Sequence, residues 1–337
     1  MNPRLQPVVS NLVVVVIALG FGAVLIALTG RNPLIGYSYV LFGATATLAN
    51  LGETLQITTV IVLTGLSFAV AATAGLWNIG TEGQLYLGAI GSMVVAFGTR
   101  DFGLYSVILC LLGGALFGAM WGLIPGILKA MYDVDEVVTT ILLNFPPVFL
   151  TDYLVTGAYR DPTSPVPRSF FIPPNSQLSV LVPGTTIGSG ILLVPLAVAI
   201  VYVLVSKSTY GFEMRILGGN RAAAKQIGLG IKKITMLSMA MAGALSGLGG
   251  SALILGVTHY LSDSLSSGYG FTGIAASALA ANNPLFLLVT ASFLSVLTVG
   301  SYSATAGLAL PTSLVGTISA IIIILTTVRN IIGQRLR

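Results

Sequence analysis

The chain has 337 residues, of which 55% are hydrophobic and only 7% are charged, whereas soluble globular domains carry roughly 25% charged residues. Its 10 acidic and 15 basic side chains are too few to cover the surface of a water-soluble fold of this length, so the composition excludes that class. The net charge of +5 does not indicate nucleic-acid binding if the basic residues lie in loops beside a membrane.

Long apolar runs without charge follow one another along the chain, and examples are Val13–Leu28, Val107–Leu123 and Ile191–Val205. An α-helix needs roughly 17–25 such residues to cross a bilayer, and the two-residue alternation of barrel strands is missing. The sequence therefore predicts an all-α polytopic membrane protein with about ten transmembrane helices. The predicted spans are Leu12–Thr29, Thr54–Ala72, Glu82–Phe97, Phe102–Ile127, Val137–Thr156, Ile191–Val205, Ile234–Leu255, Gly270–Ala281, Leu285–Ser301 and Pro311–Val328. Between the first two, Gly30–Gly52 is predicted to be a loop with a short re-entrant or interfacial helix.

The basic residues predict the orientation of these spans. An even number of spans puts both termini on the same side, together with eleven basic residues, while four basic residues fall on the other side. The positive-inside rule then places both termini in the cytoplasm. The proline-rich loop 157–190 is expected outside and the basic loop 206–233 inside, and residues 1–337 are expected to form one transmembrane domain.

The segment Trp77–Gly80 interrupts an apolar run, so Glu82 falls at the start of a helix. Thr81 and Gln84 have the spacing of a capping box, in which case Glu82 complements the positive helix end and the segment closes a broken helix. The alternative is that Asn78, Glu82 and Gln84 line a translocation pathway, because unwound backbone at membrane depth is tolerated where it faces a cavity.

Asn144 precedes Phe145-Pro146-Pro147 and predicts a kink in the fifth span, because proline removes backbone donors. This amide either borders the same pathway or satisfies carbonyls that the kink frees. Small residues at four-residue spacing predict close helix packing rather than chemistry. They are Gly114, Gly118, Gly122 and Gly126 in the fourth span, and Gly243, Gly247 and Ser251 in the seventh.

The loop 206–233 carries six basic residues against one acid, Glu213. Gly218 and Gly219 are expected to break the chain, Asn220 is a good N-cap, and Arg221–Ile227 forms a short helix that stops at Gly228. Two helical turns are not stable alone in water, so this helix needs a surface to pack against. The simpler alternative is a basic loop that contacts lipid headgroups.

Catalytic and cofactor motifs are missing from the sequence. A single cysteine and a single histidine argue against a transition-metal site, and no G-x-x-x-x-G-K-[ST] motif for ATP occurs. No nucleophile lies at a familiar spacing from a base. The sequence therefore predicts a non-enzyme without a metal or cofactor.

Four blocks in the same order resemble the ATP-binding cassette (ABC) permeases of the branched-chain amino acid, simple sugar and nucleoside class. They are Gly75-LWNIGTEG-Gln84, Asp135-EVVTTILL-Asn144, the loop motif from Gly211 to Gly228, and Gly270-FTGIAASALAANN-Pro284. The first block is most similar to the nucleoside and sugar branch, with Thr81 in place of its usual alanine. Ala280 and Ala281 stand where relatives often carry a Gly-basic pair, which argues against a charged contact by that turn.

The resemblance implies a type II ABC importer fold and a multi-pass permease subunit in the cytoplasmic (inner) membrane of a prokaryote. It implies that the loop motif is a coupling helix that contacts the ATPase, with these residues: Gly211, Arg215, Gly218, Gly219, Asn220, Arg221, Ala223, Ala224, Lys225, Ile227 and Gly228. The implied partners are cytoplasmic ATPase subunits, a second, related permease and an extracytoplasmic substrate-binding lipoprotein, besides membrane lipids and without nucleic acid.

The expected solute is a nucleoside, and a simple sugar or a branched-chain amino acid is the alternative. A rival of another class is an ion-coupled secondary transporter that uses Glu82 as its ion site. That rival leaves the capped helix at Arg221–Ile227 without a purpose.

Overall fold

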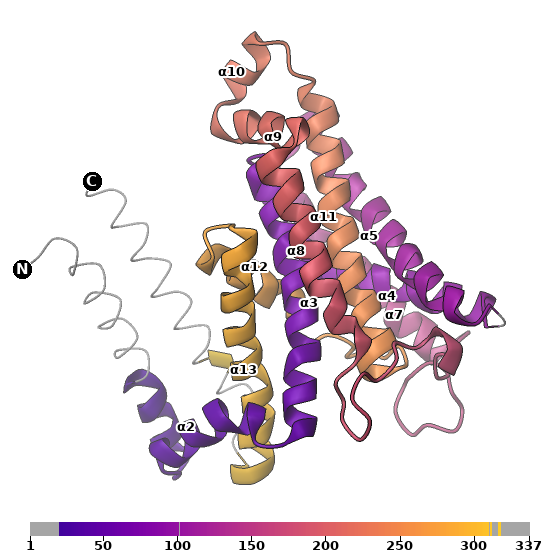
Figure 1. Ribbon diagram of the computed structural model, residues 1–337, viewed down its shortest axis with the longest axis vertical. Coiled ribbons are helices and arrows are strands. Elements are labelled where there is room, and N and C mark those ends of the chain that lie inside the picture. The colour runs from indigo at the N-terminus through magenta and orange to yellow at the C-terminus, as the bar shows by residue number, and fades with distance from the viewer. Residues whose placement is uncertain (1–19, 101, 310, 312–315, 318–337) are drawn as a thin grey trace, which may run out of the picture. The chain divides into compact units, whose positions relative to one another are not determined.

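The computed structural model describes residues 20–100, 102–309, 311 and 316–317. Over these residues the chain is helical, and its only β-structure is three isolated bridges. Two compact units are present, one made of residues 1–54 and 292–337 and the other of residues 55–291. Figure 1 labels the main helices, and we describe each unit by itself.

The helices are α2 (Pro33–Phe42), α3 (Leu48–Thr73), α4 (Thr81–Gly98), α5 (Leu104–Tyr132), α6 (Glu136–Leu142), α7 (Phe145–Thr156), α8 (Leu193–Lys207), α9 (Thr209–Gly219), α10 (Arg221–Gln226), α11 (Ile231–Leu253), α12 (Tyr269–Leu279) and α13 (Pro284–Leu308). Short 3-10 turns are η1 (Gly43–Thr45), η2 (Pro174–Ser176) and η3 (Ser189–Leu192), and η4 (Ile254–Thr258) is a π-helical end of α11.

Six helical stretches of the described chain are long and apolar enough to cross a membrane, and they match six predicted spans. They are Leu48–Thr73, Tyr105–Tyr132, Glu136–Thr156, Ser189–Lys207, Ile231–Thr258 and Pro284–Leu308. The chain is therefore a multi-pass membrane protein. Of the first predicted span, residues 20–28 are helical, and most of Pro311–Val328 lies outside the described residues.

Two predicted spans differ from this pattern. Helix α4 coincides with the predicted span Glu82–Phe97 but is not among the six. Helix α12 has only 11 residues, which at 1.5 Å per residue reach about half-way across roughly 30 Å of hydrocarbon. The helix predicted at Gly270–Ala281 is therefore present with nearly the same bounds, between Gly268 at positive φ and the turn after Leu279, but it is too short for a full span.

The smaller unit contains the segment predicted as a loop with a short helix. The Asn32 side chain caps α2 by accepting from the amide of Leu34 at 2.9 Å, and Pro33 follows as a favourable first helical residue. The side-chain amide of Asn50 donates to the carbonyl of Gly43 at 2.6 Å. Helix α3 begins at Leu48, six residues before the predicted Thr54, because this hydrogen bond and a Thr47 cap support the additional turn.

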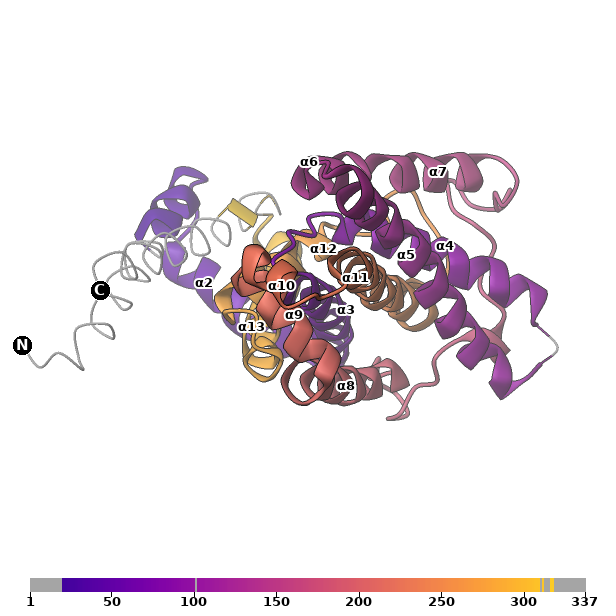
Figure 2. The same cartoon turned by 90° about the horizontal axis from the view of Figure 1, so that it is seen from above.

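In the larger unit, α4, α5 and α11 pack closely, and Figures 1 and 2 show α5 and α11 side by side. Backbone meets backbone along the predicted glycine stripes. A Cβ atom added to Gly118 would lie 2.8 Å from the Cα atom of Gly247, and one added to Gly122 would lie 3.0 Å from that of Gly243. The prediction of close packing through these small residues is confirmed.

This packing predicts that Gly118→Ala destabilises the protein by about 1–3 kcal/mol, because two backbones must separate to admit one methyl group. The matched control is Gly98→Ala in α4, where an added Cβ has open space around it. We expect a lower apparent melting temperature in detergent for the first variant and an unchanged one for the second. Equal melting temperatures for both variants would contradict the packing argument.

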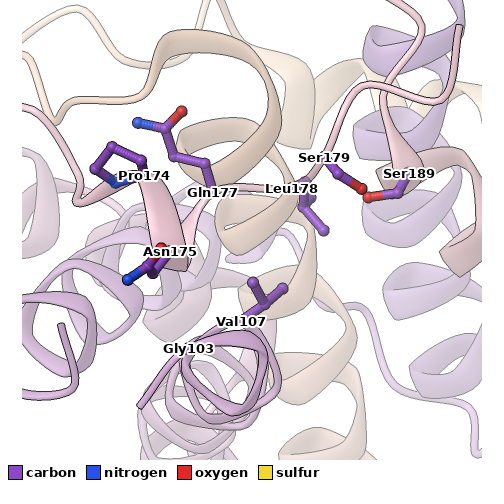
Figure 3. Close-up of a pocket in the computed structure, with 8 residues that line it drawn as sticks. All are labelled: Gly103, Val107, Pro174, Asn175, Gln177, Leu178, Ser179 and Ser189. Atoms are coloured by element: carbon purple, nitrogen blue, oxygen red, sulfur yellow. The ribbon is translucent and has the colours of Figure 1, made fainter. Parts of the chain in front are cut away.

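The segment 157–190 lacks α-helix, as predicted, and is organised by local polar contacts and isolated bridges. Arg168 pairs with the buried Asp161 at 3.0 Å and stacks on the ring of Phe171, 4.6 Å from its centroid. Part of this segment and the start of α5 line a pocket of about 270 Å³, shown in Figure 3. Gly103 and Val107 of this pocket lie at the start of α5, whereas Lys129 lies in its last turn, so the pocket and Lys129 are at opposite ends of the helix.

Candidate functional site

The basic loop folds as two capped helices, and sequence reasoning found only the second. The Ser208 hydroxyl caps α9 by accepting from the amide of Gly211 at 2.9 Å. Asn220 caps α10 by accepting from the amide of Ala223 at 3.0 Å, and Gly228 follows the helix with a φ of +75°. The predicted start and stop of the short helix are therefore confirmed. Figure 1 shows α9 and α10 together at one end of the larger unit.

Three of the residues that the resemblance implies for contact with the ATPase, Ala223, Ala224 and Ile227, differ in their exposure in the structure. Ala224 is fully buried within the chain and Ala223 is half-buried, whereas the side chain of Ile227 is 62% exposed. The burial of Ala224 shows that its side chain faces its own chain rather than the surface. The outward face of α10, by which we mean its exposed residues, consists of Arg221, Ala222, Lys225 and Gln226 and continues into Ile227.

Gly218 is needed for close contact rather than for a chain break. Helix α9 continues through Gly218 and Gly219 and ends there. A Cβ atom on Gly218 would lie 2.5 Å from the carbonyl oxygen of Thr73 and 2.8 Å from the amide of Gly75. Gly75 itself has a φ of +74°, which favours glycine. The end of α9 therefore rests directly on the backbone that leads from α3 into the broken segment.

The four predicted pathway residues, Asn78, Glu82, Gln84 and Asn144, are all buried and lie around the start of α4. Asn78 and Gln84 exchange two side-chain hydrogen bonds, at 2.9 and 3.0 Å. The side chain of Asn144 accepts from the amide of Gly83 at 2.8 Å and donates to the carbonyl of Ile79 at 2.9 Å. These amides therefore bind the unwound backbone between α3 and α4 to the break between α6 and α7.

The break between α6 and α7 is the predicted kink at Asn144. Pro146 and Pro147 carry no amide hydrogen, so the carbonyls of the preceding turn lose their usual helical partners. The indole of Trp121 in α5 donates to one of them, the carbonyl of Leu143, at 2.9 Å. Figure 2 shows α6 and α7 one after the other beside α5.

Glu82 caps a helix, but the helix is α12 rather than its own. Its carboxylate accepts from the amide of Gly270 at 2.7 Å, in the first turn of α12. The Ser266 hydroxyl accepts from the amide of Tyr269 at 3.0 Å and so satisfies another amide at the start of the same helix. A carboxylate here satisfies amides that have no partner within the helix and complements the positive end of the helix dipole.

The predicted capping box at Thr81 is not formed. The N-cap of α4 is Gly80, without a side-chain hydrogen bond, and the buried Thr81 hydroxyl has no partner. Gln84 pairs with Asn78 instead of reaching back to the cap. The reason is that the helix already begins at Thr81, so the amide of Gln84, which the box would use, donates to the carbonyl of Gly80 at 3.0 Å.

Sequence reasoning missed a set of ion pairs beside α10. Lys129 contacts Asp133 at 3.4 Å and Glu136 at 3.0 Å, and Asp133 contacts Arg221 at 3.2 Å. We call these four residues the ion-pair chain. The spacing of Lys129 and Asp133, four residues apart at the end of a helix, was a signal in the sequence, but their connection to α10 is a tertiary contact. No group of three or more His, Cys, Asp or Glu residues suited to a metal occurs within the described ranges.

Comparison with known proteins shows which family the chain resembles. A family described as branched-chain amino acid transport system / permease component matches residues 50–327. The nucleoside ABC transporter permease protein NupB of Lactococcus lactis is 34% identical, over 98% of this chain and 94% of that protein. The guanosine ABC transporter permease protein NupP of Bacillus subtilis is 31% identical, over 96% and 94%. The glucose ABC transporter permease protein TsgB13 of Haloferax volcanii is 32% identical, over 92% and 84%.

Each of these three species also has a second, weaker relative, 25–27% identical over 69–74% of this chain. The apolar helices around the polar break, by which we mean residues 75–83 together with Thr140 and Asn144, are those of a polytopic membrane protein. The chain belongs to the branched-chain amino acid transport system / permease component family, as its four sequence blocks indicated.

Proposed function

We propose that the chain is the permease subunit of an ABC importer that moves a nucleoside across the cytoplasmic membrane. The observation that carries this proposal is the similarity, over nearly the full length, to two proteins named for nucleoside and guanosine transport. A simple sugar is the second candidate, because a protein named for glucose transport is similar to nearly the same extent. The chain itself would be non-catalytic, with ATP hydrolysis carried out by partner subunits.

We further propose that α9 and α10 form the coupling element for the ATPase, with the residues predicted above from Gly211 to Gly228. The caps at Ser208 and Asn220 and the exposed outward face of α10 support this role. Ala224, Gly218 and Arg221 would contribute by holding α9 and α10 on the rest of the chain, and Lys225 and Ile227 by contact with the partner.

For Asn78, Glu82, Gln84 and Asn144 we propose a place in the wall of the pathway rather than direct contact with solute. Their hydrogen bonds are made to one another and to backbone, so they would fix the unwound segment that borders the route. This leaves the solute to be recognised by side chains that these amides hold in position.

The second permease is proposed to be a related but different chain. Support comes from the three species named above, each of which has one stronger and one weaker relative. An extracytoplasmic lipoprotein would deliver solute, and the positive-inside rule puts both termini, α9 and α10 in the cytoplasm of a prokaryotic cell. Both compact units would belong to one transmembrane domain, with loop 157–190 outside.

The test is uptake of radiolabelled guanosine into proteoliposomes that contain the chain with its ATPase, second permease and lipoprotein. We expect uptake that requires internal ATP and is competed by other purine nucleosides but not by glucose. Competition by glucose alone would support the sugar importer instead. Uptake that collapses with an uncoupler while ATP is held constant would overturn the ABC assignment in favour of ion-coupled transport.

A further inference from the structure

A pocket of about 230 Å³ lies beneath α10, between the ends of α5, α6, α9 and α11. On one side, Gly218 rests on the backbone at Gly75, as described above. On the other side lies the ion-pair chain, of which Lys129, Glu136 and Arg221 line the pocket. Around this pocket, α9 and α10 therefore contact the rest of the larger unit through two connections of different chemistry, a backbone contact at Gly218 in α9 and an ion pair at Arg221 in α10.

The two residues of the ion-pair chain that lie farthest from α10 along it are the most buried ones. The side chains of Arg221 and Asp133 are 55% and 72% exposed, whereas those of Lys129 and Glu136 are 19% and 11% exposed. An exposed pair contributes little to stability, while a partly buried pair is held in place by the cost of leaving either charge unpaired. The ion pair of Lys129 and Glu136 is thus held in place, whereas the exposed ion pair of Asp133 and Arg221 can form and break more easily.

Asp133 is held at the point where the chain turns from α5 into α6. It is the C-cap of α5 with a φ of 54°, and Asp135 then caps α6 by accepting from the amides of Val137 and Val138. Hydrogen bonding to Lys129, with the charges of Lys129 and Arg221, lowers the pKa of Asp133 below its ordinary value. The carboxylate therefore stays ionised at neutral pH and remains available to Arg221.

Helix α6 carries this connection to the polar break. Glu136, Thr140 and Asn144 follow one another at four-residue spacing and are all buried. The Thr140 hydroxyl accepts from the amide of Ile79 at 3.2 Å, and Asn144 donates to the carbonyl of the same residue at 2.9 Å. The backbone connection through Gly218 and Gly75 enters the same segment from its other end. Both connections therefore converge on residues 75–83.

We propose that Asp133 and Lys129 are positioning residues for transport, which carry the movement of α10 to α6 and so to the unwound segment before α4. This inference rests on the proposed coupling role of α10 and adds residues outside the coupling loop to it. When the ATPase moves α10, the contact of Arg221 with Asp133 moves the turn between α5 and α6. The buried face of α6 then shifts the backbone around Ile79. The contact of Gly218 with the backbone at Gly75 shifts the same segment from its other end.

The test is a charge swap in the assembled transporter. Asp133→Arg and Arg221→Asp should each reduce substrate-stimulated ATP hydrolysis and uptake by about three- to tenfold. This is the size of effect expected when one contact that couples the ATPase to the permease is lost. The double variant, with both charges exchanged, should recover to within about twofold of the unchanged protein. The matched control is Arg221→Asp with Glu213→Arg, which restores the net charge but not the pair and should not recover.

Two readouts separate this inference from the proposed function. If the unchanged chain does not co-purify with the ATPase, the coupling role of α10 itself fails. If the ATPase co-purifies and both single variants couple as the unchanged chain does, the ion-pair chain has no positioning role. Recovery by the Glu213 control as well as by the swap would also overturn the proposal, since net charge alone would then explain the effect. Asp133→Asn, which keeps the shape, should lie between the unchanged chain and Asp133→Arg.

Discussion

Ala222→Glu is expected to abolish co-purification of the ATPase while the permease still reaches the membrane in normal amounts. Ala222 lies on the outward face of α10, next to Arg221 and opposite the buried Ala224. In the proposed complex the added carboxylate would enter a tightly packed contact without a partner, and overpacking acts together with an unpaired buried charge. The loss is expected to be at least about tenfold in ATPase bound per permease and in stimulated ATP hydrolysis.

Two variants control this experiment. Ala158→Glu makes the same change at an exposed position in the segment after α7 and should leave the ATPase bound. Ala224→Glu should instead lower the amount of folded permease, because its side chain is buried in the chain itself. Full ATPase stoichiometry and full uptake with Ala222→Glu would mean that α10 is not the docking surface and that the loop only supplies positive charge.

Glu82→Leu is expected to cause the largest loss among changes to the polar break. The variant removes the acceptor of the Gly270 amide and leaves the start of α12 unsatisfied in a buried place. Such a group costs about 1–3 kcal/mol, and the lost charge at the helix end adds to this. We expect a clearly lower melting temperature and uptake reduced at least about tenfold, since α12 would no longer keep its position.

Glu82→Gln is the matched comparison, because its side-chain oxygen can still accept from the Gly270 amide. We expect uptake within about tenfold of the unchanged protein and a melting temperature between those of the leucine variant and the unchanged chain. If Glu82→Gln instead abolishes uptake at an unchanged melting temperature, the negative charge serves transport directly. The ion-coupled alternative would then regain its main support.

Local patterns predicted local structure well in this chain. Asn220 and Gly228 mark the ends of α10, and the prolines after Asn144 mark the break between α6 and α7, because caps and missing donors act within a few residues. The glycine stripes of α5 and α11 were also predictable, since four-residue spacing defines one face of a helix.

What the sequence did not predict depends on contacts between distant residues. Glu82 and Gly270 are 188 positions apart, and their hydrogen bond has no local signature. The same holds for Arg221 and Asp133, 88 positions apart. Thr81 and Gln84 have the local spacing of a capping box, but the Gln84 amide donates to the Gly80 carbonyl and the Gln84 side chain pairs with Asn78.

The short length of α12 also bears on how the protein is made. A segment of 11 residues is too short to span the bilayer by itself, so we expect it to insert together with α13 as a hairpin. Their mutual contact, a 2.8 Å hydrogen bond from the Thr290 hydroxyl to the carbonyl of Ala276, supports such a joint insertion. The hairpin then needs a hydrogen-bond acceptor for the buried amides at the start of α12. Glu82 precedes the hairpin in the chain, so the acceptor is synthesised before the helix that requires it.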